Sequence, residues 1–211
     1  MPNRQEQRSE ETKRAILEAA RELFAARGFD AVTMREIAKA AGCSHTTIYI
    51  YFKDKEALLH QLAMGPLQAL REAMEQALSD PRQAPRERLK LLSQVFLDFC
   101  LSNRSVYTTL FITGATRVDE PEPELEVNRL RNHLFGLLQR AVGEALPPGL
   151  PAERVLAYAR ACFFTLHGII ATYAASAEPF DQLMERLAST FDLALEVMLT
   201  GSIQIAEREV R

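Results

Sequence analysis

The sequence is poor in residues that bind metals or form disulfides. It has three cysteines and four histidines in 211 residues, and it has no tryptophan. The cysteines are odd in number and irregularly spaced, so they provide neither a disulfide framework nor a metal-ligand pattern. We therefore predict no metal site, and we assign no cofactor and no catalytic residue. The N-terminal stretch MPNRQEQRSEETKR is polar and mixed in charge, unlike a signal peptide, and we expect a cytoplasmic protein.

Long hydrophobic runs are scarce as well. The longest apolar stretch, residues 155–177, contains Arg160, His167 and several small side chains. Charged and small residues in such a run favour a buried helix over a membrane span, so we expect no membrane partner.

An excess of positive charge, which many nucleic-acid-binding proteins carry, is also absent. The net charge is −3, with 25 Lys and Arg against 28 Asp and Glu. Residues 1–60 carry 10 basic and 9 acidic side chains, so the N-terminal part is less acidic than the rest. Any binding of DNA must therefore depend on local geometry rather than on a global positive field.

Strand signals and tandem repeats are missing too, whereas helical periodicity continues along the chain. The pattern predicts an all-α protein with about nine helices. A first helix, visible from Thr12, ends at Gly28. A fourth runs from Lys55, with a kink or a break expected at Gly65-Pro66. Further helices are expected near 86–102, 104–115, 123–146, 152–176 and 179–200.

Two short helices are predicted between the first and the fourth. Thr33 and Glu36 have the spacing of a capping box, and Ser44 is suited to cap the next segment. That segment, TTIYIYF, has a strand-like composition, but a lone strand would have no partner in a helical chain. Two short helices joined by a turn form a helix-turn-helix, whose second helix can enter the major groove of DNA. We place a three-helix head at 1–54 and a larger body at 55–211.

Residues 12–59 resemble the N-terminal DNA-binding domain of the TetR (tetracycline-repressor-like) family of transcriptional regulators. The matching positions form one ordered set: Thr12, Ile16, Ala19, Ala20, Leu23, Phe24, Gly28, Phe29, Thr33, Ile37, Ala38, Ala41, Gly42, Ser44, Thr47, Tyr49, Tyr51, Phe52, Lys55, Glu56 and Leu58. The resemblance implies a homodimeric repressor that binds a palindromic double-stranded DNA operator and is released by a small-molecule effector. The sequence departs from the family pattern at Cys43 and Ile50.

The residues predicted to contact DNA lie on or beside the short helices: Thr33, Arg35, Ser44, His45, Thr46, Thr47, Tyr49, Ile50, Tyr51 and Lys55. Hydroxyls at helix N-termini, phenols and cations can all bind phosphate, and Ile50 can contact a thymine methyl group. Lys55 lies in the first turn of a helix, where a cation is unfavourable, and a nearby phosphate would explain its position. The alternatives are capping alone for the hydroxyls, a solvated surface for the front of the second helix, and partial packing for one tyrosine.

Polar and aromatic side chains within the apolar body helices suggest a ligand pocket: Phe99, Tyr107, Phe111, His133, Phe163 and His167. Each can instead be an ordinary core residue, which is the commoner role of a buried histidine. Gly65-Pro66 lies in the helix that links head and body, and we expect effector binding to shift this helix.

The last two predicted helices carry apolar stripes that suit a four-helix seam between two copies of the chain. The residues predicted at this dimer interface are Phe164, Gly168, Thr172, Leu187, Phe191 and Leu195. Packing within one chain is the alternative for the same stripes.

Two other functions are compatible with the sequence. An enzyme could use Cys100 or Cys162 with a histidine, but Cys162 and His167 are five residues apart and lie on different faces of a helix. An interaction protein could retain the fold without binding an operator. Cys43 could act as a redox switch or, more simply, as a small buried apolar residue. The helix-turn-helix favours a regulator over an enzyme, whereas salt-dependent binding to the DNA upstream of its own gene would separate a regulator from an interaction protein.

Overall fold

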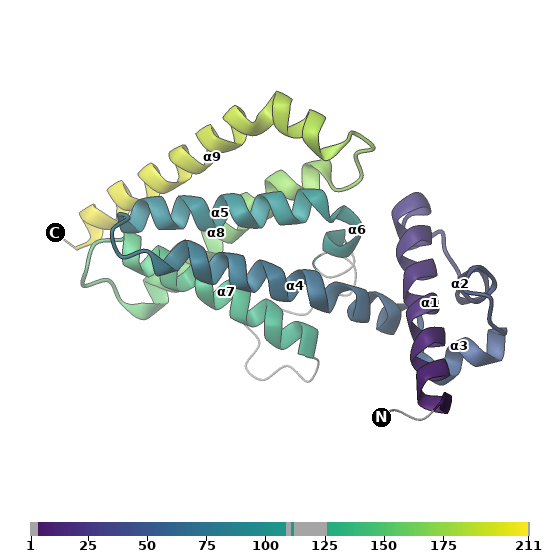
Figure 1. The fold of residues 1–211 in the computed structure, drawn as a ribbon. Coiled ribbons are helices and arrows are strands. Elements are labelled where there is room, and N and C mark those ends of the chain that lie inside the picture. Colours follow the sequence, from purple (N-terminus) through teal and green to yellow (C-terminus); the bar gives the residue numbers. More distant parts are fainter. Residues whose placement is uncertain (1–3, 109–110, 112–125, 211) are drawn as a thin grey trace. The chain divides into compact units, whose positions relative to one another are not determined.

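The computed structural model describes residues 4–108, 111 and 126–210. Within this part of the chain the regular secondary structure is helical, without strands (Figure 1). The helices are α1 (Arg4–Arg27), α2 (Met34–Ala40), α3 (His45–Tyr51), α4 (Lys55–Ser79), α5 (Pro85–Ser102), α6 (Arg104–Tyr107), α7 (Glu126–Ala145), α8 (Ala152–Tyr173) and α9 (Phe180–Glu209). The prediction of an all-α fold is confirmed.

The chain divides into two compact units. The first contains the chain up to Pro66 together with the segment that starts at Ser105, and the second contains the remainder. The division falls inside α4, later than the predicted boundary at residue 54. We call the residues up to Pro66 the head, and the second half of α4 with α5, α7, α8 and α9 the body.

The head is a small hydrophobic core enclosed by its helices. Fully buried side chains come from each of them: Ile16 of α1, Ile37 of α2, Ile48 of α3 and Leu58 of α4. α1 packs on α2, and α2 packs on α3. Each buried aliphatic side chain stabilises the fold by about 1.5–3 kcal/mol relative to exposure. This core therefore holds α2 and α3, which at seven residues each are too short to be stable alone.

The body is built from longer helices. α5, α7 and α8 contact one another, and α9 packs on α5 and α8 (Figure 1). Ion pairs connect α5 to α9, because Lys90 Nζ lies 3.0 Å from both Asp192 Oδ2 and Glu196 Oε1. α9 is therefore held to the body by charge as well as by buried side chains.

The interruption predicted at 65–66 does not break the helix, because α4 continues through Pro66. Proline has no N–H and so removes the hydrogen bond to the carbonyl of Leu62. The neighbouring side chains Ala63 and Leu67 are fully buried, and their packing offsets this loss. Of the two expected outcomes, a kink or a break, the break does not occur.

Helix ends differ from the predicted ones where the sequence signal is weak. α1 begins earlier than predicted, because its first turns are polar and carry no apolar periodicity. α9 continues beyond residue 200, where Ala206 is fully buried and Glu209 forms an ion pair with Arg154 of α8. α6 covers the start of the helix predicted at 104–115, half of which lies outside the described residues.

Candidate nucleic-acid interface

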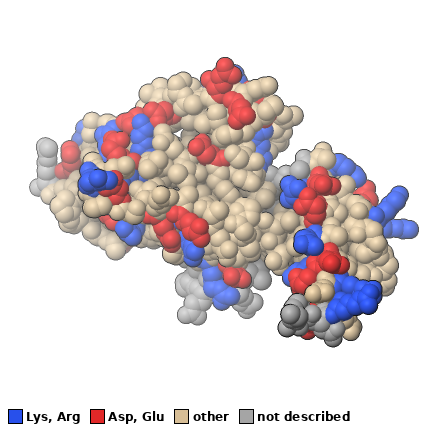
Figure 2. Space-filling model, viewed as in Figure 1, with Lys and Arg blue, Asp and Glu red and all other residues tan. Residues whose placement is uncertain are grey.

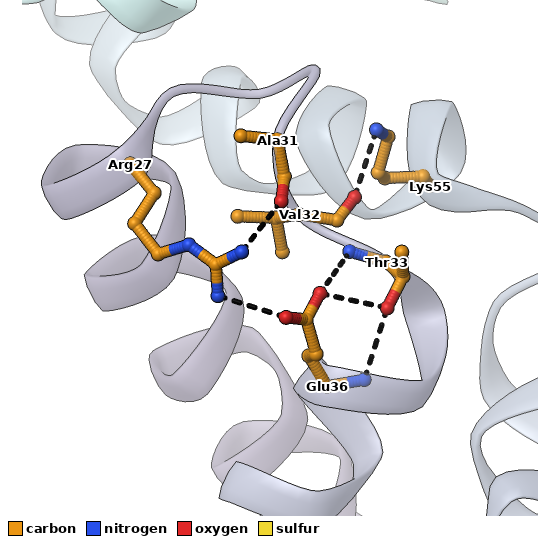
Figure 3. Close-up of polar contacts among 6 residues, drawn as sticks. All are labelled: Arg27, Ala31, Val32, Thr33, Glu36 and Lys55. Carbon is orange, nitrogen blue, oxygen red and sulfur yellow. Dashed lines mark hydrogen bonds and ion pairs between the residues drawn. The ribbon is translucent and has the colours of Figure 1, made fainter.

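The N-terminus of α2 is fixed by reciprocal hydrogen bonds between Thr33 and Glu36. The Thr33 hydroxyl accepts from the Glu36 amide at 3.3 Å, and the Thr33 amide donates to Glu36 Oε2 at 2.9 Å (Figure 3). This is the predicted capping box. Arg27 of α1 adds an ion pair to Glu36 Oε1 at 2.8 Å. Hydrogen bonds from Thr33 and Arg27 lower the pKa of Glu36 to about 2, so this carboxylate is charged at neutral pH.

The turn between α2 and α3 requires a left-handed backbone conformation, and Gly42 supplies it with a φ of +70°. The Cys43 amide closes the turn by donating to the Ala38 carbonyl at 3.0 Å. The Ser44 hydroxyl then caps α3 by accepting from the Thr47 amide at 3.0 Å. The predicted helix-turn-helix and both of its caps are present.

α3 has one buried face and one exposed face. Ile48 and Phe52 are buried, so this side holds α3 to the head core. On the other side Ile50 is 78% exposed and Tyr49 is 47% exposed. The ring of His45 stands edge-on to that of Tyr49, with ring centroids 5.2 Å apart. The exposed face therefore combines two aromatic rings with an aliphatic side chain.

The predicted contact residues of α3 do not all face outward. Thr46 is exposed, whereas Thr47 is half-buried and its hydroxyl lies 2.6 Å from that of Ser44. Tyr51 is also half-buried, because its ring packs on the head core and its phenol accepts a hydrogen bond from Ser9 of α1 at 3.3 Å. The first tyrosine of α3 is therefore better placed than the second to contact a phosphate.

A hollow of about 420 Å³ lies between α2 and α3. Its lining residues are Thr33, Arg35, Glu36, Ala38, Lys39, Cys43 and His45. Arg35 and Lys39 are four residues apart and share one face of α2, so two cations border the hollow. Lys39 is absent from the predicted contacts, although its spacing from Arg35 is visible in the sequence. On the face shown in Figure 2, basic side chains are interspersed with acidic ones, and they form no continuous positive surface there.

Lys55 has partners that its sequence position does not reveal. Its ammonium group donates to the carbonyls of Phe29 at 2.7 Å and Val32 at 2.9 Å. It also lies 4.2 Å from the centre of the Phe29 ring. These groups compensate a positive charge at the N-terminus of α4. These partners explain the position of Lys55 without a phosphate, and its contact with DNA stays a prediction.

The three cysteines are free thiols of limited reactivity. Cys43 is partly buried, and burial raises the pKa of its thiol. Burial also raises the pKa of Cys162 to about 12 and the pKa of Cys100 well above its usual range. A thiolate is therefore disfavoured at each position, which argues against the redox switch and against a cysteine nucleophile.

Two separate pairs of predicted pocket residues come together. Tyr107 and Phe111 are both buried and stack with ring centroids 5.6 Å apart. In α8 the ring centroids of Phe163 and His167 are 4.3 Å apart. Burial, reinforced by the positive charge of Arg131, lowers the pKa of His167 to about 4. This imidazole is therefore neutral at physiological pH.

His133 lies on the surface rather than in a pocket, contrary to prediction. Its side chain is exposed, and Nε2 lies 3.0 Å from Glu75 Oε1 of α4. It belongs to the polar face of α7, which the sequence pattern did not distinguish from the apolar face. Phe99 of α5 is half-buried. Arg131 was not predicted but is buried, and it donates to Asn128 Oδ1 at 3.0 Å; its place within the apolar stripe of α7 was the available signal.

The predicted dimer stripe is divided between exposed and buried positions. On α8, Phe164 is 66% exposed, and Gly168 and Thr172 are also exposed. On α9, Phe191 and Leu195 are buried within a single chain. These two side chains already pack within their own chain, which leaves almost none of their surface for a partner chain.

α9 has a second apolar stripe that faces outward. Leu193 is 63% exposed and Val197 is 66% exposed. Leu187, the remaining predicted interface residue, is half-buried. The predicted stripe is the more regular of the two, and packing within the chain accounts for it.

Comparison with known proteins relates both parts of the chain to one family. Residues 16–62 match the family described as bacterial regulatory proteins, tetR family, and residues 89–198 match the tetracyclin repressor-like C-terminal domain. The fatty acid metabolism regulator protein of Bacillus subtilis is 25% identical over 190 residues, which cover 88% of this chain and 93% of that protein.

Solved structures show the same fold. FadR from Bacillus subtilis, in complex with stearoyl-CoA, has a TM-score of 0.61 at 22% identity and covers 89% of this chain and 97% of its own. A TetR variant from Acinetobacter baumannii, in complex with minocycline, has a TM-score of 0.63 at 23% identity and covers 90% of this chain and 96% of its own.

The C-terminal family match alone covers more than half of the chain, and the N-terminal match covers the helix-turn-helix. The similar proteins are transcriptional regulators, and the buried thiols of this chain are unsuited to nucleophilic catalysis. The chain belongs to the TetR family of bacterial transcriptional regulators, and it is a DNA-binding regulator rather than an enzyme.

Proposed function

We propose that this regulator is a cytoplasmic repressor that binds a palindromic operator as a homodimer and is released by a small-molecule effector. The observation that carries the proposal is the exposed face of α3, which Ile48 anchors from the buried side. A short helix that is anchored from behind and exposed in front can lie in a major groove without repacking the head.

The exposed residues offer different groups to base edges and to the DNA backbone. His45 and Thr46, at the N-terminal end of α3, can hydrogen-bond to base edges, and Ile50 can contact a thymine methyl group. The exposed phenol of Tyr49 suits a phosphate oxygen. On α2, Arg35 supplies positive charge near the backbone. Base recognition and backbone contact therefore come from separate side chains.

Support for the homodimer comes from the exposed apolar face of α8 and α9. Phe164 of α8 and Leu193 and Val197 of α9 are large apolar side chains open to solvent in one chain. α8 is long and apolar enough to cross a membrane by length and composition alone, and 28% of that apolar window is buried within the chain. A second copy packed on this face would account for the composition without a membrane. Two heads related by a two-fold axis would then bind the two halves of a palindrome.

Support for an effector comes from the similar structures and from the body. The Bacillus subtilis structure contains stearoyl-CoA, and the Acinetobacter baumannii structure contains minocycline. In this chain Phe163 of α8 contacts Phe135 of α7, with ring centroids 5.6 Å apart, and His167 on its own helix. A neutral imidazole among apolar rings suits a largely apolar ligand that carries a hydrogen-bonding group. We place the effector site at this aromatic cluster.

The effector signal is proposed to pass along α4, which continues from the head into the body. The double substitution Gly65→Ala, Pro66→Ala restores the missing hydrogen bond and stiffens the helix, so it should weaken induction. Operator affinity is measured with and without effector in both proteins. Induction equal to that of the wild type would contradict the role of this segment.

The function is tested with the DNA upstream of the protein's own gene. Fluorescence anisotropy should show specific binding that weakens linearly with log salt concentration, and footprinting should show two related half-sites. A scrambled fragment of equal length is the control. Binding that is absent, or equal for both fragments, would favour the interaction-protein alternative.

Effector release is tested separately by a thermal-shift screen that starts with stearoyl-CoA. A ligand that raises the melting temperature should also lower operator affinity, because the two ligands favour different states. A stabilising ligand that leaves operator affinity unchanged would contradict release by that ligand.

A further inference from the structure

The loop that joins α1 to α2 is held by cations from two helices. Lys55 Nζ of α4 donates to the carbonyls of Phe29 and Val32, at 2.7 and 2.9 Å. Arg27 Nη2 of α1 donates to the carbonyl of Ala31 at 2.8 Å (Figure 3). Three backbone carbonyls of this loop thus accept hydrogen bonds from side chains of α1 and α4, which lie outside the loop.

One of the carbonyls that accept from Lys55 lies directly before the N-terminus of α2. Val32, one of its acceptors, precedes Thr33, which is the N-cap of α2. Glu36 closes the capping box and is also paired with Arg27, so the two cations act on the same end of this helix (Figure 3). Because α2 packs on α3, the orientation of α3 depends on this end of α2.

The surroundings of the Lys55 ammonium suit an internal role. It lies over the Phe29 ring, and this ring packs against Phe24 of the head core with centroids 5.2 Å apart. An ammonium group has three N–H donors, and two of them are directed at carbonyls. Most of the hydrogen-bonding capacity of this ammonium is therefore used inside the head.

We infer that Lys55 is a positioning residue that fixes the α1–α2 loop, and through it α2 and α3, without contacting DNA. The inference rests on the proposed operator binding. It extends that proposal by distinguishing the residues that contact the operator from Lys55, which fixes the conformation of the head. A positioning residue changes affinity without changing the number of phosphates neutralised, and this difference can be measured.

The first experiment compares Lys55→Met with Lys53→Met on the upstream DNA fragment over a series of salt concentrations. Methionine keeps the apolar stem and removes the charge, and Lys53 is an exposed lysine two residues away. Lys55→Met should bind roughly tenfold more weakly than wild type, as expected for the loss of charge-assisted hydrogen bonds. Its salt slope should equal that of wild type.

Two results of this experiment would contradict the inference. A salt slope that flattens by about 0.9 would mean that one phosphate fewer is neutralised, and it would identify Lys55 as a DNA-binding residue. Affinity equal to that of wild type would show that the hydrogen bonds to the loop do not position α3. The Lys53→Met protein shows how much either quantity changes when a charge is simply removed from this segment.

The second experiment needs no DNA, so it separates this inference from the proposed function. Amide hydrogen exchange is measured in the full-length protein, with Ala20 in the middle of α1 as an internal reference. In Lys55→Met the amides of Val32 and Thr33 should exchange about tenfold faster, because the loop opens locally. Equal exchange in both proteins would refute the positioning role. If the wild-type protein binds no DNA but these two amides still exchange faster in Lys55→Met, the proposed function is refuted. The positioning of the loop by Lys55 is then still supported.

Discussion

Ile48 and Ile50 lie two residues apart in α3, yet one side chain is fully buried and the other is 78% exposed. The buried residue fills the head core, and the exposed one contacts solvent beside Tyr49. The buried face therefore holds α3 to the head, while Ile50 on the opposite face is accessible to a thymine methyl group in the proposed complex.

Substitution of these two isoleucines should separate stability from recognition. Ile48→Ala leaves a cavity in the head core and should lower the free energy of unfolding by about 3 kcal/mol. Ile50→Ala should leave stability within about 0.5 kcal/mol of wild type. It should instead reduce discrimination between thymine and other bases at one operator position per half-site. Chemical denaturation and anisotropy on a set of single-base operator variants measure both effects; an unchanged base preference in Ile50→Ala would remove it from the interface.

The two tyrosines of α3 should also differ in their effect on binding. Tyr49→Phe removes an exposed phenol and should weaken operator binding about three- to tenfold, the range for one hydrogen bond. Tyr51→Phe removes the acceptor of the Ser9 hydroxyl and should leave operator affinity close to wild type. Anisotropy at a fixed salt concentration compares them. An equal loss of operator affinity in both proteins would mean that Tyr51 also contacts the DNA phosphates.

Local features of the head follow from the sequence because both partners lie within a few residues. The Thr33–Glu36 box and the cap of Ser44 on Thr47 are pairs separated by three residues, and Gly42 marks the turn between them. The opposite faces of α3 follow from helical spacing in the same way. The sequence alone therefore predicts the local structure of the candidate interface.

Contacts between distant segments do not follow from the sequence. The acceptors of Lys55 are backbone carbonyls 26 and 23 residues away, and a carbonyl has no sequence signature. α9 carries two apolar stripes, and periodicity alone does not say which of them packs within the chain. Phe191 was assigned to the dimer interface for this reason, although it is buried in its own chain.

The outward stripe of α8 and α9 makes a separate prediction about assembly. If the proposed homodimer forms through this stripe, Phe164→Glu should shift it from dimer to monomer, because a charge would be buried at the interface. Leu91→Glu is the control, since Leu91 is also an exposed apolar residue but lies on α5. Sedimentation velocity over a range of concentrations measures the change. A dimer that survives Phe164→Glu would place the interface elsewhere.

His167 predicts a pH dependence of stability. Burial and the charge of Arg131 lower its pKa to about 4 in the folded chain, whereas the unfolded chain has the ordinary value of about 6.5. Between these values the unfolded chain binds a proton that the folded chain does not, so acid favours unfolding. The contribution of the neutral His167 to the free energy of unfolding is therefore fully present above pH 6.5, and it is lost as the pH falls towards 4.

The measurement is the melting temperature of wild type and His167→Gln between pH 7 and pH 4.5. The wild-type melting temperature should fall more steeply over this range, because the amide of glutamine does not titrate. His133→Gln, which removes an exposed histidine of α7, should keep the wild-type fall. Parallel curves for wild type and His167→Gln would mean that the imidazole can charge inside the folded body. The aromatic cluster would then be open to water, and an apolar effector site there would be untenable.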